Sequence, residues 1–157
     1  MENKIDNPGV HIPPPMIYLA FFLIALLLQR KWPLDFSFFK TTLSKIIGAV
    51  FILISLSFSI TALAKFFKSK NTVITHKPAT SLQTTGIYTI SRNPMYISLS
   101  LLYAGLSLLL GNWWNFIVLP IIILIIQQYV IKNEEKYLKR KFGQAYEDYC
   151  SKVRRWL

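Results

Sequence analysis

The sequence predicts an all-α integral membrane protein with about four transmembrane helices and a cytoplasmic amphipathic C-terminal helix. Hydrophobic residues make up 53% of its 157 residues, which is more than an ordinary soluble domain of this size contains. Uncharged apolar runs of about the length of a membrane span recur along the chain. The formal net charge of +11 is concentrated between these runs and after the last one, as expected for cytoplasmic segments of a membrane protein.

The N-terminal half, residues 1–75, is expected to supply two spans. Residues 1–15 are polar and end in three prolines, which can begin a helix because its first N–H groups lack partners in any case. Residues 16–28 are an uninterrupted apolar run that is short for a full span. Residues 46–64 form the second span. Its small polar residues are expected to make helix-packing contacts; they are Ser55, Ser57, Ser59 and Thr61.

The C-terminal half, residues 76–157, is expected to form the functional core of this single domain. It contains a helical hairpin over residues 94–131, with a tight connection at residues 111–112 and a predicted kink at Pro120. The tail, residues 132–157, carries apolar residues at spacings of three and four. This pattern predicts an amphipathic helix that lies on the membrane surface or packs on the site, interrupted at Gly143; the residues are Leu138, Phe142, Tyr149, Val153 and Trp156.

The distribution of basic residues predicts the orientation of the chain. With four spans, the N-terminus, the polar stretch 65–93 and the tail lie on one side of the membrane. They hold fourteen of the eighteen Lys and Arg residues, which the positive-inside rule places in the cytoplasm. We therefore expect a multi-pass protein of a bacterial or archaeal inner membrane whose polar clusters face the cytoplasm.

Several classes of site are disfavoured by composition. No helix-turn-helix, zinc or aromatic-basic pattern is present, so a nucleic-acid partner is not expected, and the first partner is the lipid bilayer. The single cysteine, Cys150, excludes an intramolecular disulfide and a cysteine-based metal site. No histidine cluster supports a metal, so none is expected. The N-terminus lacks a basic region and a cleavage site of the signal-peptide kind.

The first polar cluster is the stretch from residue 86 to residue 96, GIYTISRNPMY. An ordinary structural role for it is an arginine that reaches the membrane surface and a proline that starts a helix. A functional role is also open, because Tyr88, Tyr96 and residues 80–83 add hydroxyls, amides and backbone N–H groups. Such groups can hold an amino-acid moiety or a ribose in a half-dry pocket.

The second polar cluster is Glu134-Glu135, directly after the last apolar run. The structural explanation is that these acids form ion pairs with Lys132, Lys136, Lys139 or Arg140. The functional explanation is that one glutamate binds the positive end of a ligand. Adjacent helical residues point about 100° apart, so one glutamate can face the core while the other faces water.

Taken together, the pattern GIYxxxRNPMY, two apolar segments and EExxLxxxFGxxYxxYxxxV resembles the membrane-embedded isoprenylcysteine carboxyl methyltransferases and phospholipid methyltransferases. The resemblance covers residues 80–154. It implies an S-adenosylmethionine-dependent methyltransferase whose lipophilic or small acceptor enters from the bilayer. It implies cofactor contacts at Thr80, Ser81, Leu82, Gln83, Tyr88, Asn93, Pro94, Met95, Tyr96, Glu134 and Glu135, with Glu134 at the cofactor's positive end. We assign catalytic roles to Arg92, Asn93 and Glu134, and acceptor contacts to Arg154 and Gln127.

Two residues depart from the family pattern. Asn93 stands where the family often has histidine, and asparagine forms hydrogen bonds but cannot act as a general base near neutral pH. Val130 stands where prenylcysteine methyltransferases carry an arginine one turn before the glutamate pair. A prenylcysteine carboxylate is therefore a doubtful acceptor unless Arg154 or Arg92 takes over that contact.

Two alternatives remain open on the sequence. Phe142-Gly143 and Tyr149-Cys150 are similar to the tail of the sterol reductases, which are NADPH-dependent membrane enzymes of greater length. A small transporter or scaffold is the other alternative, although the apolar runs contain no ionisable residue of the kind that proton-coupled transporters carry. The methyl acceptor and the oligomeric state are not predicted.

Overall fold

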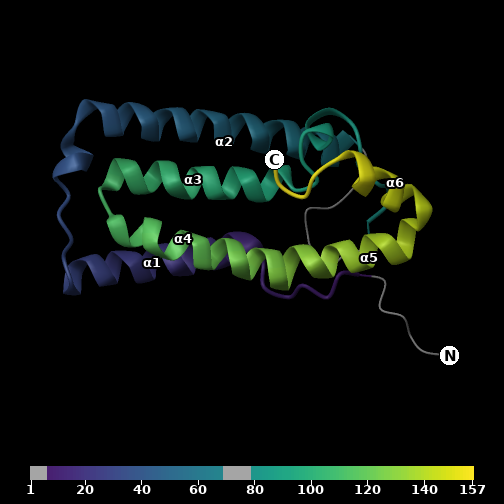
Figure 1. The fold of residues 1–157 in the computed structure, drawn as a ribbon, viewed down its shortest axis with the longest axis horizontal. Helices are drawn as coiled ribbons and strands as arrows, with labels where there is room; N and C mark the ends of the chain where they lie inside the picture. Colours follow the sequence, from purple (N-terminus) through teal and green to yellow (C-terminus); the bar gives the residue numbers. More distant parts are fainter. Residues whose placement is uncertain (1–6, 69–78) are drawn as a thin grey trace.

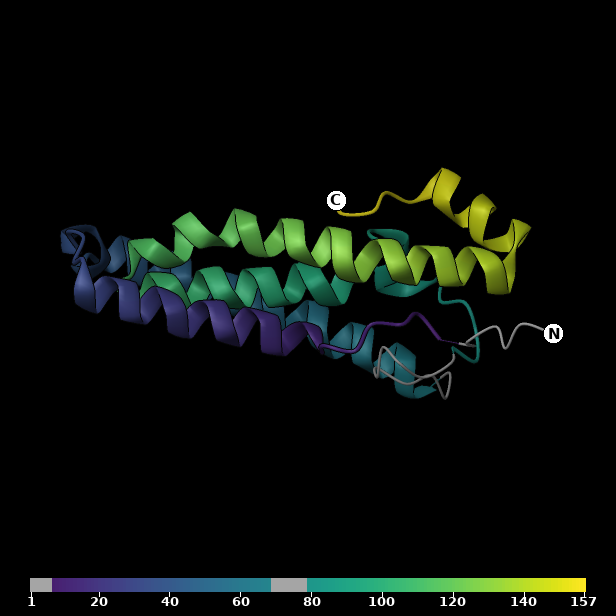
Figure 2. The same ribbon diagram turned by 90° about the horizontal axis from the view of Figure 1, so that it is seen from below.

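The computed structural model describes residues 7–68 and 79–157. Four long helical segments lie side by side in alternating directions (Figures 1 and 2). They are α1 (Pro14–Lys31), α2 (Thr42–Lys68), α3 (Pro94–Leu110) and α4 (Trp113–Ile125). α4 continues through a π-helical turn, η3 (Ile126–Ile131), into α5 (Lys132–Phe142). The described part of the chain contains no β-strand, which agrees with the predicted all-α class.

Membrane-spanning length is met by three helices of the described chain: α1, α2 and the continuous helix Trp113–Phe142. α1 is longer than the predicted apolar run because it begins at Pro14, with proline in its first turn. α3 is a shorter apolar helix of 17 residues. At 1.5 Å per residue it is about 25 Å long, against about 30 Å for a bilayer core. The structure thus supports three of the four expected spans, and a full crossing by α3 stays a prediction.

Small residues bring α2 and α3 into close contact. A Cβ atom added to Gly105 would lie 2.9 Å from the carbonyl oxygen of Gly48 and 2.8 Å from Cγ1 of Ile52. Further along the interface, Ser55 Oγ donates to the carbonyl oxygen of Ser98 over 2.8 Å, and Ser59 bonds the Ser98 hydroxyl. The expectation that the serines of α2 pack against a helix is confirmed for Ser55 and Ser59, which lie one turn apart.

Polar residues also fasten the other helix pairs. The hydroxyls of Tyr18 in α1 and Ser100 in α3 are 2.8 Å apart. Asn112 caps α4 by accepting a bond from the Trp114 N–H over 2.9 Å, and its amide donates to the carbonyl oxygen of Ala25 over 3.1 Å. The first bond joins α1 to the middle of α3, and the Asn112 bonds fix the connection between α3 and α4.

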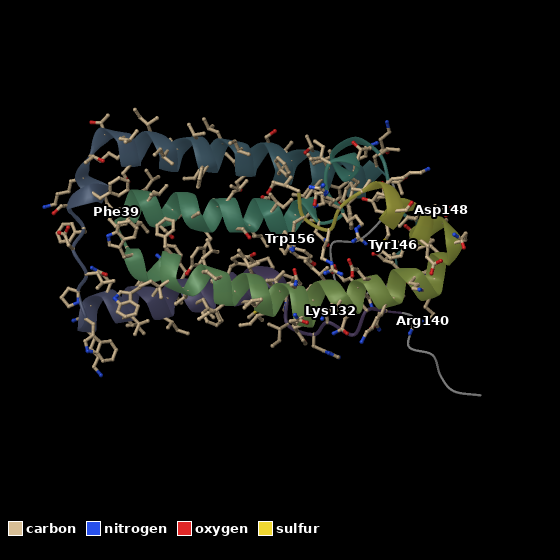
Figure 3. The ribbon with its side chains drawn as sticks, in the orientation of Figure 1. Phe39, Lys132, Arg140, Tyr146, Asp148 and Trp156 are labelled. Carbon is tan, nitrogen blue, oxygen red and sulfur yellow. The ribbon has the colours of Figure 1, made fainter. Side chains whose placement is uncertain are left out.

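Aromatic side chains gather at the end of the bundle where both helical hairpins turn. The rings of Phe39 and Trp113 lie 4.7 Å apart and those of Phe39 and Phe116 6.4 Å apart. Figure 3 shows Phe39 at this end, with Tyr146 and Trp156 toward the opposite end. The polar segments 79–93 and 132–157 thus share the end of the bundle away from the hairpin turns (Figure 1).

The tail forms two helices where one interrupted helix was predicted. α5 ends at Gly143, which has a φ of 52°, and α6 (Gln144–Lys152) then folds back over α5 (Figure 2). The apolar face of α6, with Tyr146 and Tyr149, packs against Tyr88 and Ala62 of the bundle. The α6 part of the tail therefore packs on the segment that holds Tyr88, and a membrane-surface position for α5 stays a prediction.

Candidate functional site

The first wall of the site is a short 3-10 helix, η2 (Gly86–Thr89), followed by the start of α3. Gly86 has a φ of 66°, and a Cβ atom there would lie 3.0 Å from Cε of Lys65. Both the turn and the close passage of Lys65 therefore favour glycine at this position. Pro94 opens α3. This geometry directs Tyr88 and Tyr96 inward, and both side chains are buried.

Glu134 faces these tyrosines from α5. The Tyr96 hydroxyl donates to Glu134 Oε1 over 2.7 Å. The buried Tyr88 hydroxyl has no hydrogen-bond partner within the described residues. Burial chiefly, with the nearby charges of Tyr149 and Glu134, raises the pKa of Tyr88. The Tyr96–Glu134 hydrogen bond thus joins the start of α3 to the start of α5, and the buried Tyr88 lies near enough to Glu134 for the two to interact electrostatically.

Glu135 points to a different set of partners. Arg155 donates to both of its carboxylate oxygens, from Nε over 2.9 Å and from Nη2 over 2.7 Å. Arg92 Nη1 lies 3.3 Å from Glu135 Oε1 and donates to Cys150 Sγ over 2.6 Å. Hydrogen bonding to Glu135 raises the pKa of Arg155. The ion pairs predicted for Glu135 with Lys132, Lys136, Lys139 or Arg140 were wrong, because the C-terminal segment returns and brings Arg155 instead.

The last residues of the chain are tied down by backbone contacts. The Arg92 N–H donates to the carbonyl oxygen of Arg154 over 3.0 Å. Asn93 Nδ2 and Ser91 Oγ both donate to the carbonyl oxygen of Arg155, over 2.9 and 3.2 Å. Asn93 therefore holds the tail, and the structure does not direct its amide at the Tyr96–Glu134 pair.

Gln127 and Arg154, which were assigned to acceptor contacts, do not point into a common site. Trp156 Nε1 donates to Gln127 Oε1 over 2.9 Å, so this amide oxygen also fastens the tail. Arg154 is exposed. Val130, in the position of the family arginine, is fully buried among apolar side chains.

The stretch 79–83 lies beside α5 and η2. The Ala79 N–H donates to the Tyr137 hydroxyl over 2.9 Å, and Gln83 Nε2 donates to Ser81 Oγ over 2.9 Å. Leu82 packs with Met95 in the apolar cluster around Tyr88. Thr80 is exposed. The predicted cofactor-binding residues of this stretch thus adjoin the tyrosine cluster, and their contacts with a cofactor stay a prediction.

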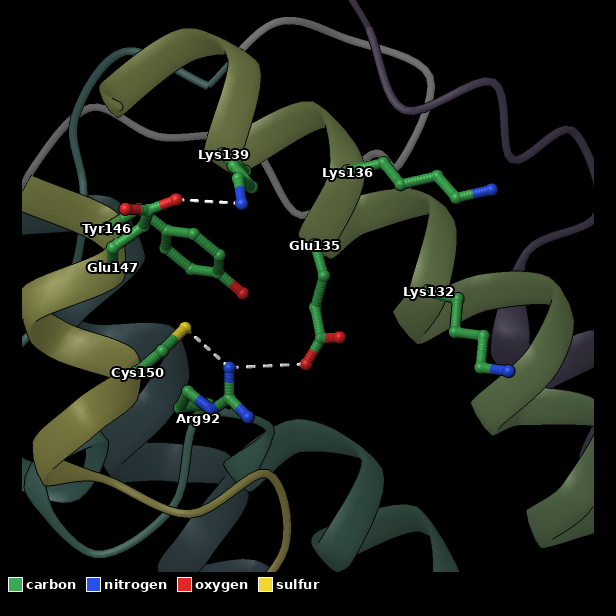
Figure 4. Close-up of a pocket in the computed structure, with 8 residues that line it drawn as sticks. All are labelled: Arg92, Lys132, Glu135, Lys136, Lys139, Tyr146, Glu147 and Cys150. Carbon is green, nitrogen blue, oxygen red and sulfur yellow. Dashed lines mark hydrogen bonds and ion pairs between the residues drawn. The ribbon is translucent and has the colours of Figure 1, made fainter. Parts of the chain in front are cut away.

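A cavity of about 390 Å³ lies on the Glu135 side, between α5 and α6 (Figure 4). Arg92 closes its inner end, where the guanidinium sits between Cys150 and Glu135. Among the described residues, no group of three His, Cys, Asp or Glu side chains could hold a metal ion. The cavity is lined by Arg92, Lys132, Glu135, Lys136, Lys139, Tyr146, Glu147 and Cys150.

Sequence reasoning missed three residues of this region: Arg155, Tyr146 and Cys150. Tyr149 is fixed by a 2.6 Å bond to the carbonyl oxygen of Tyr88, and burial raises its pKa to about 12. This bond anchors α6, which places Tyr146 and Cys150 against Arg92. The spacing of tyrosines in the tail was the available signal for α6, whereas no periodicity distinguishes Arg155 from Arg154.

Comparison with known proteins places these motifs in a family. The model of the phospholipid methyltransferase family matches residues 41–145. An uncharacterized protein from Haemophilus influenzae is 48% identical over 63 residues, which are 40% of this chain and the whole of that protein. The protein-S-isoprenylcysteine O-methyltransferase of Schizosaccharomyces pombe is 35% identical over 72 residues, 46% of this chain and 30% of that enzyme. No solved structure matches the chain.

The matched region contains the tyrosine cluster, both glutamates and the helices that position them. It points to a membrane methyltransferase and favours neither the sterol reductase-like nor the non-enzymatic interpretation. The family match extends over more than half of the sequence, so this chain belongs to the phospholipid methyltransferase family.

Proposed function

We propose that this protein transfers a methyl group from S-adenosylmethionine to a lipophilic or small acceptor at the cytoplasmic face of the membrane. The observation that carries the proposal is the Glu134 carboxylate, held by Tyr96 beside the unpartnered hydroxyl of Tyr88. A buried donor without a partner costs free energy, and it is retained where a ligand completes its hydrogen bond.

The residues fit the chemistry of this cofactor. Glu134 Oε1 accepts the Tyr96 bond, whereas Oε2 accepts no hydrogen bond within the described chain and can face a cation. A carboxylate suits the ammonium and sulfonium groups of the cofactor, and the Tyr88 hydroxyl suits an oxygen acceptor on it. A phosphate-bearing cofactor such as NADPH would instead require basic side chains in this position.

The task left to the protein is positioning. When bound, S-adenosylmethionine supplies a methyl group that is already activated by its positive sulfur. Glu134 and Tyr96 orient the donor, and the apolar residues around Tyr88 exclude water, so that an acceptor can meet the methyl group in line. No general base is required in this scheme, and Asn93 supports it by holding the tail in place.

The proposed acceptor class follows from what surrounds Glu134. The buried Val130 provides no positive charge one turn before it, and Arg92 is engaged by Glu135 and Cys150. These contacts support an acceptor bound through its apolar part over one bound through a carboxylate. The excess of basic residues on the segments at this end of the bundle supports its cytoplasmic orientation.

Calorimetric titration of the detergent-purified protein tests the proposal. We expect S-adenosylmethionine and S-adenosylhomocysteine to bind and NADPH not to bind. Glu134→Gln should weaken binding about tenfold or more, because it removes a charge-assisted contact worth roughly 1.5–3 kcal/mol.

Glu147→Gln is the matched control. Its carboxylate pairs with Lys139 on the exposed face of the tail over 2.7 Å, and we expect unchanged affinity. If only NADPH binds, the protein is a reductase-like enzyme and the proposal is wrong. If none of the three compounds binds, Glu134, Tyr96 and Tyr88 have a structural role only.

A further inference from the structure

The helix that carries Glu134 contains an irregular turn just before α5. In η3 (Ile126–Ile131) the pattern is π-helical, and the Lys132 N–H donates to the carbonyl oxygen of Gln127, five residues back. An α-helix bonds residues four apart, so a π-helical turn holds one residue more than an α-helical turn. We propose that η3 sets the register of α5, and that Gln127 and Tyr129, which hold this turn, are positioning residues for Glu134.

The register decides which side chain faces Tyr96. Without the extra residue of η3, each residue of α5 would take the place of the residue after it. Asn133 would then stand where Glu134 stands, and an uncharged amide would face Tyr96. Glu134 would move about 100° around the helix into the place of Glu135, where a carboxylate still meets Arg155. The ion pair of the tail can thus survive the shift, whereas the charge beside Tyr96 cannot.

Two segments from distant parts of the chain hold the turn. After α6, Trp156 Nε1 donates to Gln127 Oε1 over 2.9 Å. Before α1, the Tyr129 hydroxyl oxygen accepts from the N–H groups of His11 and Ile12 over 3.2 and 3.4 Å. The two segments pass on opposite sides of the helix that runs from α4 into α5 (Figure 2). The turn is therefore held from both sides.

The contacts around Tyr129 are part of the packed protein. Val10, next to the residues that bind the Tyr129 hydroxyl, is fully buried in the same apolar cluster as Val130 and Ile131. Asn133 Nδ2 donates to the carbonyl oxygen of Tyr129 over 2.7 Å, which joins the turn to the start of α5. These contacts stabilise a geometry that helices rarely adopt and that frequently occurs at functional sites.

The register can be measured without any cofactor, although the role of Glu134 itself rests on the proposed function. Lys136 is exposed, whereas the neighbouring Tyr137 is only 3% exposed. After a shift by one residue, residue 136 would take the buried place of Tyr137. In the background Cys150→Ser, which removes the only natural cysteine, Lys136→Cys provides a single thiol. Its alkylation by N-ethylmaleimide is followed by mass spectrometry.

The test variant is Tyr129→Phe/Trp156→Phe, which removes the hydroxyl and the indole N–H and keeps an aromatic ring at each place. We expect alkylation at residue 136 to slow about tenfold, as it would with the shifted register in about nine molecules of ten. Loosening of the helix without a shift would speed alkylation up, so the sign separates positioning from packing. Affinity for S-adenosylmethionine should fall about tenfold, because an amide replaces the carboxylate.

A relocated carboxylate should rescue the binding. Asn133→Glu, added to Tyr129→Phe/Trp156→Phe, should recover most of the lost affinity, because residue 133 then faces Tyr96. The same substitution alone should not raise the affinity. Trp114→Phe is the matched control: it removes an indole N–H that donates to the Trp32 carbonyl oxygen over 2.8 Å at the opposite end of the bundle, and both readouts should stay as in wild type.

Unchanged or faster alkylation at residue 136 in Tyr129→Phe/Trp156→Phe would overturn the proposal. Loss of affinity that Asn133→Glu does not recover would also overturn it. Thermal unfolding shows whether the variant is folded; if it is not, Tyr129→Phe and Trp156→Phe are measured singly, and each should slow the alkylation. If the wild-type protein does not bind S-adenosylmethionine, the proposed function fails, while the alkylation rates still decide whether η3 sets the register.

Discussion

The bundle and the tail are held together in different ways. In the bundle, α2 and α3 approach so closely that a single Cβ at Gly105 would meet backbone. In the tail, Arg155 binds a carboxylate through its side chain and two polar side chains through its carbonyl oxygen. α2 and α3 thus meet where side-chain volume is absent, with serine hydrogen bonds beside that contact, whereas the last residues of the tail are held by directional polar contacts.

This difference follows from the two environments, the lipid interior around the bundle and the water at the membrane surface around the tail. Within a bilayer, apolar surface gains little by leaving lipid, so helices associate through close packing and small residues. At the membrane surface water competes for every polar group, and only bonds with several partners hold a segment in one place. The tail is such a segment, and it packs on the residues that surround Tyr88.

The largest effect is expected from filling the close contact in the bundle. Gly105→Val places a branched side chain where Gly48 and Ile52 leave no space, and overpacking of this kind costs about 3 kcal/mol. We expect most of the folded protein to be lost on purification in detergent, measured by size-exclusion chromatography.

Leu110→Ala is the control for the bundle, because Leu110 is in the same helix and 61% exposed. Its folded yield should match that of wild type. A Gly105→Val protein with normal yield would show that α2 and α3 can separate, and that the contrast between bundle and tail is overstated.

Much of the bundle could be predicted from sequence because its pattern is regular. Uncharged runs marked the helices, and the polar clusters before residue 94 and after residue 131 were correctly expected at one end. Helix geometry alone predicted different surroundings for Glu134 and Glu135, but the second glutamate was expected to face water, whereas Glu135 pairs with Arg155 and Arg92. Pro120 lies inside α4, where a kink stays a prediction, and the π-helical turn at η3 had no signal in the sequence.

The tail was less predictable because its final contacts are not periodic. α6 ends at Lys152. Helical spacing therefore cannot predict whether Arg154 or Arg155 points toward the protein. The assignment of an acceptor contact to Arg154 rested on its charge, whereas the neighbouring Arg155 makes the ion pair. Such choices depend on where a distant carboxylate lies, which the local sequence does not encode.

The second-largest effect is expected from removing the ion pair that holds the C-terminal tail. Arg155→Ala removes two charge-assisted hydrogen bonds to Glu135, each stronger than a neutral one. We expect the backbone amides of residues 146–157 to exchange with deuterium about tenfold faster, and the affinity for S-adenosylmethionine to fall. Hydrogen-exchange mass spectrometry measures the first effect.

Arg154→Ala is the matched control for Arg155→Ala. It removes an equal charge from an exposed side chain and keeps the backbone bond to Arg92. Exchange should remain as in wild type. Equal acceleration in the two variants would mean that net charge, and not the ion pair with Glu135, holds the tail.

The smallest effect on stability is expected at Tyr88, where stability and cofactor affinity should change in opposite directions. Tyr88→Phe removes a buried hydroxyl that has no partner within the described residues, so the protein without cofactor should be equally stable or about 1 kcal/mol more stable. Binding of S-adenosylmethionine should weaken several-fold, because the ligand loses its bond to that hydroxyl. Burial raises the pKa of Tyr88, so the hydroxyl stays protonated and the loss should be constant between about pH 6 and 9.

Tyr149→Phe should have the opposite effect on stability. Its hydroxyl donates to the carbonyl oxygen of Tyr88 over 2.6 Å, and removing it leaves a buried acceptor unpaired, at a cost of roughly 1–3 kcal/mol. Thermal unfolding and calorimetric titration of the two variants side by side measure both quantities. A loss of stability in Tyr88→Phe, with unchanged affinity for the cofactor, would show that Tyr88 is part of the packing between tail and bundle and contributes nothing to the binding of a methyl donor.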